Sequence, residues 1–291
     1  MSGAADRATA TPALGTPARE ALDGAITAIA AAGCETPRLD AELLLAYALG
    51  VGREQLLTSR ELVVQGPAVR IFQDAVRRRS VEREPVAYIT GRRGFRRIEL
   101  TVDRRALIPR PETELLVEVG LGLPAGARML DLGTGCGAIA LALKSERPDL
   151  HISGSDVSEA AIELAELNSS QLELEIAWMH ADLLTDAGEF DAILSNPPYI
   201  AESERATLAP EITRHEPAGA LFGGTDGLET FRAVFDQLAE RTDTRFVALE
   251  VGAGQAAAVA ALAQAAGFDN CRFERDLARI QRVVVAERRQ Q

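Results

Sequence analysis

The sequence predicts an α/β protein, in which an open, mostly parallel sheet of seven strands follows a small all-helical domain. Three observations support this class. From Pro111 onward, apolar strand segments alternate with helical segments, which is typical of a parallel sheet covered on both faces. Before residue 85, the apolar spacing is helical. The chain has 291 residues, 47% of them hydrophobic, which is ample for a sizeable core.

The amino-terminal region divides into a tail and a helical domain. Residues 1–16 are rich in Ala, Thr, Gly and Pro, and we expect them to be a disordered tail. Residues 17–84 carry four helical segments. Thr16 and Thr36 are the expected N-caps of the first two, because each stands before a proline at the first helical position.

Residues 85–110 are expected to link the two domains as a β-hairpin. Apolar and polar residues alternate in the second half of this segment, at Ile98, Leu100 and Val102. The segment from Arg92 to Arg110 is also rich in arginine. These arginines can solvate a surface hairpin or form a local basic patch, and the sequence leaves both interpretations open.

Residues 111–291 form the predicted sheet domain, which opens with a helix that has acidic residues in its first turn. The strands are expected at residues 127–133, 151–156, 175–182, 190–198, 245–252, 270–276 and 282–287. The last two follow each other without a helix between them. We therefore expect them to be antiparallel neighbours at the edge of the sheet.

Composition narrows the class of function. A net charge of -12 argues against a protein that binds mainly to the phosphate backbone of nucleic acid, because such binding depends on clustered Lys and Arg. Three cysteines and three histidines are scattered along the chain, which favours neither a disulfide framework nor a metal site. We see no secretory signal and no stretch long and apolar enough to cross a bilayer. A reducing cytoplasm fits best.

A glycine-rich turn follows the first strand of the sheet domain, in "LDLGTGCGAIALAL", which begins at Leu130. Glycines between a strand and a helix let the backbone approach a ligand at the positive end of the helix. Gly133, Gly135 and Ala138 fit the dinucleotide pattern G-x-G-x-x-G/A. With Gly137 as the third glycine, the same turn fits the G-x-G-x-G of nucleoside-bearing methyl donors. The glycines alone leave both cofactors open.

Two carboxylates end the next two strands. Asp156 lies roughly 20 residues past the glycines, where an acidic residue accepts hydrogen bonds from ribose hydroxyls. It could instead cap the next helix, but Ser158 competes for that cap. Asp182 can accept from the exocyclic amine of a purine or can be a solvated loop acid. Since ligands of open parallel sheets bind at the carboxyl ends of the strands, both are expected beside the glycine turn.

The fourth strand ends in "SNPPY", at Asn196-Pro197-Pro198-Tyr199. Proline cannot donate to a sheet, so a buried strand stops here at a rigid edge. The side-chain oxygen of Asn196 and the carbonyl of Pro197 can together hold one planar –NH2 group by both hydrogens. Tyr199 offers an aromatic face on which a planar amide or base can stack.

These motifs lie among longer segments that resemble a known family. "GRRGF", "LIPRPETELLV", "SNPPYI", "EPAGALFGGTDGL" and "RDLARIQRVVVAE" together resemble the HemK/PrmC family, over about residues 17–287. The resemblance implies a Rossmann-like seven-stranded methyltransferase sheet. It also implies an S-adenosylmethionine-dependent enzyme that methylates the glutamine of the Gly-Gly-Gln motif in class I peptide-chain release factors. The helical domain would then help to grip the release factor.

The resemblance also implies the roles of individual residues. Residues of the turn and of the strand ends would hold the methyl donor, namely Gly133, Thr134, Gly135, Cys136, Gly137, Asp156, Asp182, Leu183 and Asn196. Asn196, Pro197, Pro198 and Tyr199 would receive the glutamine amide. Among these, Asn196, Pro197 and Tyr199 are the expected catalytic residues. The chain departs from the family at Leu183, where relatives often have an aromatic residue, and at Thr242-Asp243-Thr244, which replaces a glycine-rich turn.

Other functions stay open at this point. A methyltransferase for an exocyclic amine of a nucleic-acid base would use the same NPPY motif, and the arginines between residues 92 and 110 keep it open. An NAD-dependent oxidoreductase is permitted by the glycines but has no use for NPPY, and a non-catalytic binding module would not need Asn196 and Tyr199. We expect a monomeric enzyme with a release factor as partner and without a metal, a membrane or direct nucleic-acid binding.

Overall fold

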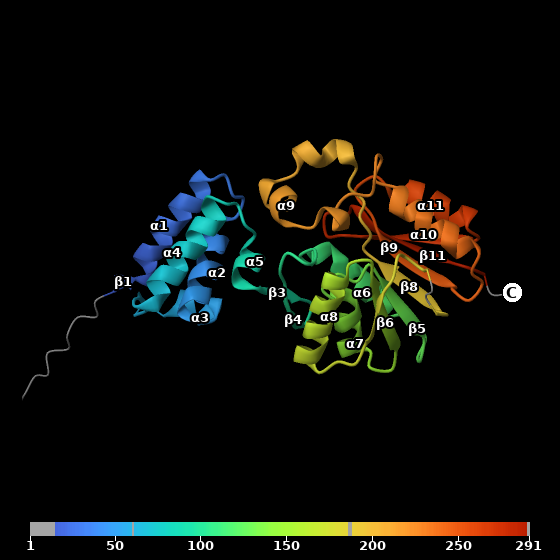
Figure 1. Ribbon diagram of the computed structural model, residues 1–291, viewed down its shortest axis with the longest axis horizontal. Coiled ribbons are helices and arrows are strands. Elements are labelled where there is room, and N and C mark those ends of the chain that lie inside the picture. The colour runs from blue at the N-terminus through green and yellow to red at the C-terminus, as the bar shows by residue number, and fades with distance from the viewer. Residues whose placement is uncertain (1–14, 60, 186–187, 290–291) are drawn as a thin grey trace, which may run out of the picture. The chain divides into compact units, whose positions relative to one another are not determined.

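The computed structural model describes residues 15–59, 61–185 and 188–289. The chain divides into two compact units, Met1–Thr90 and Gly91–Gln291 (Figure 1). Nearly all of the predicted tail therefore lies outside the described residues. Within the described ranges, no helix is both long enough and apolar enough to cross a bilayer.

The first unit is a set of helices closed around an apolar core. They are α1 (Ala18–Ala31), α2 (Pro37–Leu49), α3 (Arg53–Thr58), α4 (Pro67–Ser80) and α5 (Val86–Thr90). Ile29, Leu44 and Phe72 are buried in the core, one from each of the three long helices. A buried ion pair adds a polar link between α2 and α4, since Arg79 Nε lies 2.6 Å from Asp40 Oδ2.

The start of α1 differs from the prediction. Thr16 does not cap the helix but lies in a short strand, β1 (Thr16–Pro17), which pairs antiparallel with β2 (Val63–Val64). Pro17 is the N-cap and Ala18 the first helical residue. The Ala18 N–H donates to the Leu62 carbonyl at 2.9 Å. This backbone bond satisfies a free N–H of the first turn, so no threonine cap is needed.

The segment from residue 85 to 110 also differs in part. Its first residues, with Tyr88 among them, form the helix α5 instead of a strand. Tyr88 is buried and Ile89 joins the core of the first unit, so tertiary packing overrides a short and ambiguous pattern. The hairpin follows as β3 (Arg92–Phe95) and β4 (Ile98–Thr101), paired antiparallel.

The second unit is built on a seven-stranded sheet in the order β10-β11-β9-β8-β5-β6-β7. The strands are β5 (Arg128–Leu132), β6 (His151–Asp156), β7 (Ala177–His180), β8 (Ala192–Ser195), β9 (Phe246–Glu250), β10 (Asn270–Arg275) and β11 (Gln281–Glu287). Neighbours from β9 to β7 are parallel. β11 is antiparallel to both β9 and β10. The predicted α/β class and the antiparallel pairing of the last two strands are confirmed.

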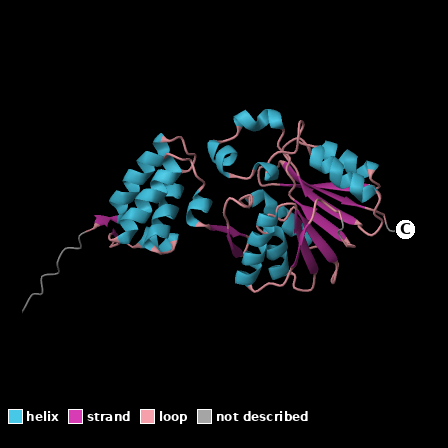
Figure 2. Cartoon of the chain, viewed as in Figure 1, coloured by secondary structure: helices cyan, strands magenta, loops and turns pink. Residues whose placement is uncertain are grey.

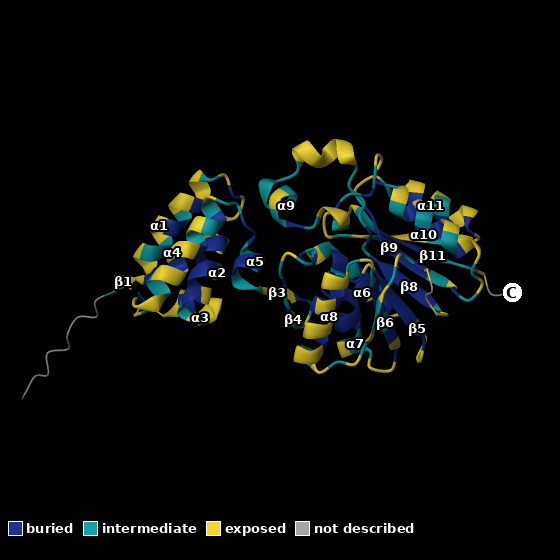
Figure 3. Ribbon diagram, viewed as in Figure 1, coloured by how far each residue is buried: buried dark blue, intermediate teal, exposed yellow. Residues whose placement is uncertain are grey.

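Helices cover both faces of this sheet (Figure 2). On one face, Leu130 and Ile193 pack with Phe231 of α10 in a single core cluster. On the other, Gly120 of α6 lies so close to Leu143 and Leu194 that a Cβ atom there would clash. The central strands β5, β8 and β9 are accordingly buried, whereas the edge strands β7 and β10 are partly exposed. The outer sides of the helices are exposed (Figure 3). The longer helices are α6 (Glu114–Gly120), α7 (Ala138–Glu146), α8 (Glu159–Leu172), α10 (Glu229–Ala239) and α11 (Ala256–Ala265), and the short ones are η1 (Pro111–Thr113), η2 (Glu202–Thr207), α9 (Pro210–His215) and η3 (Ala218–Ala220).

The order of the strands reverses at β5, which pairs with β6 on one side and with β8 on the other. The loops that follow β5 and β8 therefore diverge at the carboxyl edge of the sheet. A crevice forms where connections diverge in this way, and it is where open α/β sheets bind their ligands.

Candidate active site

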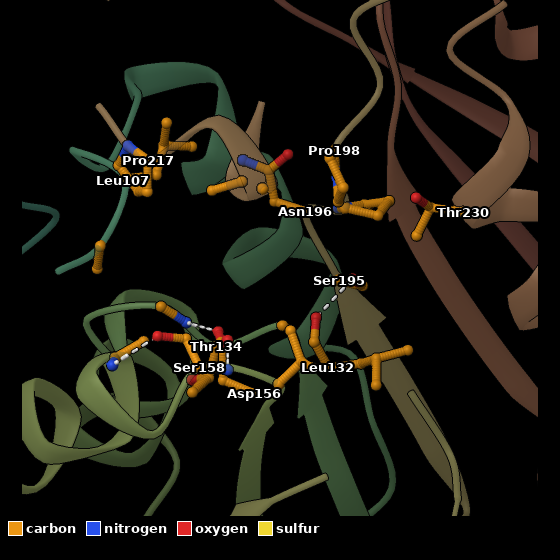
Figure 4. A pocket seen from close by; sticks show the side chains of 18 of the residues that line it. Leu107, Leu132, Thr134, Asp156, Ser158, Ser195, Asn196, Pro198, Pro217 and Thr230 are labelled. Carbon is orange, nitrogen blue, oxygen red and sulfur yellow. Dashed lines mark hydrogen bonds between the residues drawn. The ribbon is translucent and has the colours of Figure 1, made fainter. Parts of the chain in front are cut away.

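A cavity of about 550 Å³ lies at this edge of the sheet. Figure 4 shows Asn196 and Pro198 on one side of it and Thr134, Asp156 and Ser158 on the other. Its walls are the loops after β5, β6, β7 and β8, the segment before α6, the segment around η3 and the start of α10. The predicted residues that line it are Gly133, Thr134, Gly135, Cys136, Asp156, Asp182, Leu183, Asn196, Pro197 and Pro198.

The glycine turn is shaped by the buried carboxyl group of Asp131. Its Oδ2 accepts from the Thr134 hydroxyl at 2.6 Å and from the Ala140 N–H at 3.1 Å, so it joins the turn to the first residues of α7. Burial raises the pKa of Asp131 to about 7, although these two hydrogen bonds act to lower it. Gly137, which ends the turn, has a φ of 84° and crowds Trp178, where a Cβ atom would lie 3.0 Å away. A third glycine is therefore required at position 137, as in the G-x-G-x-G pattern.

Asp156 faces the turn from the end of β6. Its Oδ2 accepts from the Gly135 N–H and its Oδ1 from the Ser158 N–H, both at 2.9 Å. The Ser158 hydroxyl accepts from the Ala161 N–H at 3.2 Å, so Ser158 is the cap of α8. A carboxylate has about four acceptor positions, which leaves two at Asp156 for hydroxyl donors in the cavity.

Asp182 and Leu183 form the next part of the wall, after β7. Asp182 is exposed, and its carbonyl accepts from the Thr185 N–H at 3.1 Å. Leu183 has a φ of 51°, in the left-handed region where a leucine is strained by about 1 kcal/mol. The Leu184 N–H, bonded to Gln237 Oε1 at 2.8 Å, helps to fix this turn. Leu183 thus offers an apolar surface to the cavity instead of an aromatic ring.

The NPPY loop leaves β8 beside the glycine turn. The Ser195 hydroxyl donates to the Leu132 carbonyl at 2.6 Å and so joins the ends of β8 and β5. Asn196 Nδ2 donates to the Thr113 hydroxyl at 3.1 Å. Within the described part of the chain, no protein group donates to Asn196 Oδ1 or to the Pro197 carbonyl. Two acceptors are therefore available at the cavity wall.

The segment "FGGTDG" packs against the back of the NPPY loop without room for side chains. A Cβ atom on Gly223 would lie 2.4 Å from the Pro198 carbonyl oxygen, and one on Gly227 would lie 2.3 Å from that of Tyr199. The Gly223 N–H also donates to the Ile200 carbonyl at 2.9 Å. The glycines of this motif thus fix the backbone that carries Pro197 and Pro198.

Tyr199 lies elsewhere than predicted. It packs against the core beneath the sheet edge, and it is not among the described residues that line the cavity. Its hydroxyl donates to Glu250 Oε1 at 3.4 Å, and burial together with the Glu250 charge raises the pKa of the phenol. The ring lies close to Gly252, where a Cβ atom would be 3.2 Å from the Tyr199 ring. The structure therefore gives Tyr199 a supporting place and not a stacking surface.

A partly buried ion pair joins two segments that line the cavity. Arg110 Nη2 lies 2.6 Å from Glu216 Oε1, and the Glu216 side chain is only 2% exposed. This pair connects the segment with Leu107 to the segment with Pro217, and both residues line the cavity (Figure 4). Other arginines of the arginine-rich segment also have partners, as Arg96 has in Glu146 at 2.6 Å. An arginine that is paired with a carboxylate is less available to phosphates than a free one.

Several residues of the site were not identified from the sequence. Thr113, Asp131, Glu216 and Glu250 are all buried polar residues with partners at the cavity or behind it. The first three stand in the motifs "RPETE", "LDLG" and "EPAGA", and these motifs were the only indication of them in the sequence. Glu250 lies in an otherwise apolar strand, where a buried acid is itself unusual.

The lining fits a nucleoside-bearing methyl donor. Asp156 keeps acceptor positions for ribose hydroxyls, the glycine turn lets the backbone come close, and Leu132, Ile139, Ala161 and Val234 offer apolar surface to a base. The cavity has ample volume for a ligand of that size. The residues present are therefore able to hold S-adenosylmethionine.

Comparison with known proteins gives matches over most of the chain. Residues 20–91 match the PrmC N-terminal domain, and residues 111–220 match the methyltransferase small domain. The release factor glutamine methyltransferase of Rhodospirillum rubrum is 39% identical over 274 residues, which cover 92% of this chain and 84% of that protein. The protein of the same name from Caulobacter vibrioides is 40% identical over 262 residues, or 87% of this chain and 90% of that protein.

A solved structure shares the fold. The hMettl16 catalytic domain in complex with MAT2A 3'UTR hairpin 6 has a TM-score of 0.53 and 16% sequence identity, and the match covers 77% of this chain and 82% of that chain. At this identity the likeness extends to the methyltransferase fold and not to the substrate.

Proposed function

The chain belongs to the family of release factor glutamine methyltransferases, and we propose that it transfers a methyl group from S-adenosylmethionine to the side-chain amide nitrogen, N5, of the glutamine in the Gly-Gly-Gln motif of class I peptide-chain release factors. The observation that carries this proposal is the pair of free acceptors at the cavity wall. Asn196 Oδ1 and the Pro197 carbonyl accept from no protein donor in the described chain, and a primary amide has two hydrogens to give them.

The protein's task is alignment. Bound S-adenosylmethionine supplies a methyl group that is already activated on a sulfonium sulfur. An amide nitrogen is a weak nucleophile because its lone pair is delocalised into the carbonyl. Asn196 and Pro197 hold both amide hydrogens, which fixes the plane of the amide and points its nitrogen into the cavity. The nitrogen would take the methyl group as the sulfur–methyl bond breaks, with S-adenosylhomocysteine as the leaving group, and would then release one of its two protons. As positive charge develops on that nitrogen, the two acceptors bind it more strongly than they bind the resting amide.

The methyl donor is held opposite this pair. Asp156 accepts from the ribose hydroxyls, while Gly133 to Gly137 let the backbone lie against the donor. Asp182 and Leu183 border the adenine, with the leucine as an apolar contact. Tyr199 supports the loop from beneath through its hydrogen bond to Glu250. The donor and the glutamine thus meet between the ends of β5, β6 and β8.

The alternative, methylation of a nucleic-acid base, has less support. The same pair of acceptors would hold an exocyclic amine. Binding the phosphates around a flipped base calls for free basic side chains, whereas Arg96, Arg105 and Arg110 are each bonded to carboxylates.

A direct experiment separates the two substrates. The purified chain is incubated with S-adenosylmethionine and an unmethylated class I release factor, and the peptide with the Gly-Gly-Gln motif is analysed by mass spectrometry. We expect one added methyl group on the glutamine, and none on a release factor in which that glutamine is replaced by glutamate. A methylated nucleoside from a parallel incubation with RNA or DNA, with the release factor unchanged, would overturn the proposal.

A further inference from the structure

Thr113 holds the Asn196 side chain from behind. The Asn196 Nδ2 donates to Thr113 Oγ1 at 3.1 Å, across 83 residues of sequence. Thr113 ends η1 and is 3% exposed, and both residues line the cavity. This contact joins the segment "RPET" to the NPPY loop at the place where the substrate amide is received.

The direction of this hydrogen bond matters, because an asparagine side chain has a donor end and an acceptor end of nearly the same shape. A threonine hydroxyl can donate or accept, so alone it would hold either end. The structure has the hydroxyl accepting from Asn196 Nδ2, which leaves Oδ1 for the cavity. Glu250 on β9 lies beside this hydroxyl. When Glu250 is ionised it only accepts, so the hydroxyl proton can turn to it while the lone pairs stay with Asn196 Nδ2.

Glu250 has the capacity for this contact. It is 1% exposed, its Oε1 accepts from the Tyr199 hydroxyl at 3.4 Å, and its Oε2 has no hydrogen-bond partner among the described residues. A buried carboxyl group is costly unless it receives hydrogen bonds. The two hydroxyl groups of Tyr199 and Thr113 are the donors beside it.

We propose that Thr113 is a positioning residue that holds the Asn196 amide with its nitrogen turned away and its Oδ1 presented to the substrate nitrogen. This inference rests on the proposed function and deepens it, since it says what keeps the acceptor in place. An inverted Asn196 would point its own N–H groups at the N–H groups of the glutamine. Donor would then face donor, and the substrate amide would lose one of its two hydrogen bonds to the protein.

The kinetic test compares a substitution that removes the hydroxyl with one that keeps it. Thr113→Val keeps the shape but removes the hydroxyl, and we expect kcat for release-factor methylation to fall by roughly 10- to 100-fold, with the Kd for S-adenosylhomocysteine unchanged. Thr113→Ser keeps the hydroxyl and should restore kcat close to that of the wild type. Equal losses in both variants, or a wild-type kcat in Thr113→Val, would overturn the proposal.

A second background separates orientation from packing. Asn196→Asp has an oxygen at both ends of the side chain, so its orientation no longer matters. We expect Thr113→Val to have little further effect on kcat in that background, although it is large in the wild type. The same fold-loss in both backgrounds would show that Thr113 acts through packing.

A spectroscopic test does not depend on the substrate. The side-chain amide signal of Asn196 in a ¹⁵N–¹H spectrum is identified by its absence in Asn196→Asp. In Thr113→Val this signal should shift and its hydrogens should exchange faster, whereas Thr207→Val, which removes an exposed hydroxyl bonded to the Glu204 carbonyl, should leave it unchanged. An unchanged Asn196 signal in Thr113→Val would overturn the inference. If the wild type methylates no release factor, it is the proposed function that fails, and this signal still decides the role of Thr113.

Discussion

The Gly135 N–H donates to Asp156 Oδ2 at 2.9 Å, and this hydrogen bond joins the turn after β5 to the end of β6. The carboxylate that is expected to hold the ribose therefore also fixes the glycine turn that is expected to receive the rest of the donor. One residue couples the two halves of the donor site, and a change there affects both.

Replacement of Asp156 should weaken donor binding. Asp156→Asn removes the charge and turns an N–H group toward either Gly135 or Ser158, both of which are donors. We expect the Kd for S-adenosylhomocysteine, measured by calorimetry, to rise by roughly 10- to 100-fold. The control is Asp149→Asn, which removes an exposed aspartate paired with Arg147 before β6 and should leave the Kd unchanged. Equal Kd values for Asp156→Asn and the wild type would contradict this role.

A methyl group on Gly223 should disturb the substrate side of the cavity. The Cβ atom of Gly223→Ala would lie 2.4 Å from the Pro198 carbonyl oxygen, so the NPPY backbone must move. A displacement near 1 Å is expected to lower kcat by about 100-fold, with little change in donor affinity. Gly94→Ala is the matched control, because a Cβ atom there meets nothing within 4 Å. Normal kcat in Gly223→Ala would show that the loop is not held as described.

Stability should fall as pH rises through neutrality. Burial raises the pKa of Glu250 to about 7 from its ordinary value of 4.5, so folding favours the protonated acid. Its stabilising contribution is complete below about pH 4.5 and is lost as pH rises through about 7, a change on the order of 3 kcal/mol in the free energy of unfolding. Asp131 contributes in the same direction, because burial raises its pKa to about 7 as well.

The Glu250→Gln variant shows how much of this pH dependence comes from Glu250. Urea unfolding of both proteins at several values between pH 5 and pH 8 measures the free energy of unfolding. The variant should lose less stability over this range than the wild type does, and the remaining decline belongs to Asp131. Parallel curves for the two proteins would mean that Glu250 does not titrate in this range.

The sheet could be predicted because strand and helix periods alternate clearly after residue 111. Each of the seven strands lies within or next to its expected segment, β6 at the same residues. The predictions at Thr16 and at Val86–Thr90 are wrong for one reason: contacts distant in sequence decided the local structure. Ala18 bonds to Leu62, and Ile89 packs in the core of the first unit, which no local pattern contains.

Much the same limit applies to the site. Residues that approach a ligand directly, such as Asp156 and Asn196, stand at strand ends and are visible in the sequence. The residues behind them are not, because the Asn196–Thr113 and Tyr199–Glu250 contacts span 83 and 51 residues. The inward turn of Tyr199 follows from these contacts as well. The resemblance to the HemK/PrmC family, by contrast, is confirmed by the relatives that are about 40% identical.

The most direct test of the account is the Asn196→Ala variant. Single-turnover methylation of the Gly-Gly-Gln peptide is measured by mass spectrometry, together with the Kd for S-adenosylhomocysteine. We predict that the methylation rate falls by roughly 100- to 1,000-fold while the Kd stays close to that of the wild type, since Asn196 holds the substrate amide as charge develops. A retained methylation rate, or a loss that weaker donor binding explains entirely, would contradict the account.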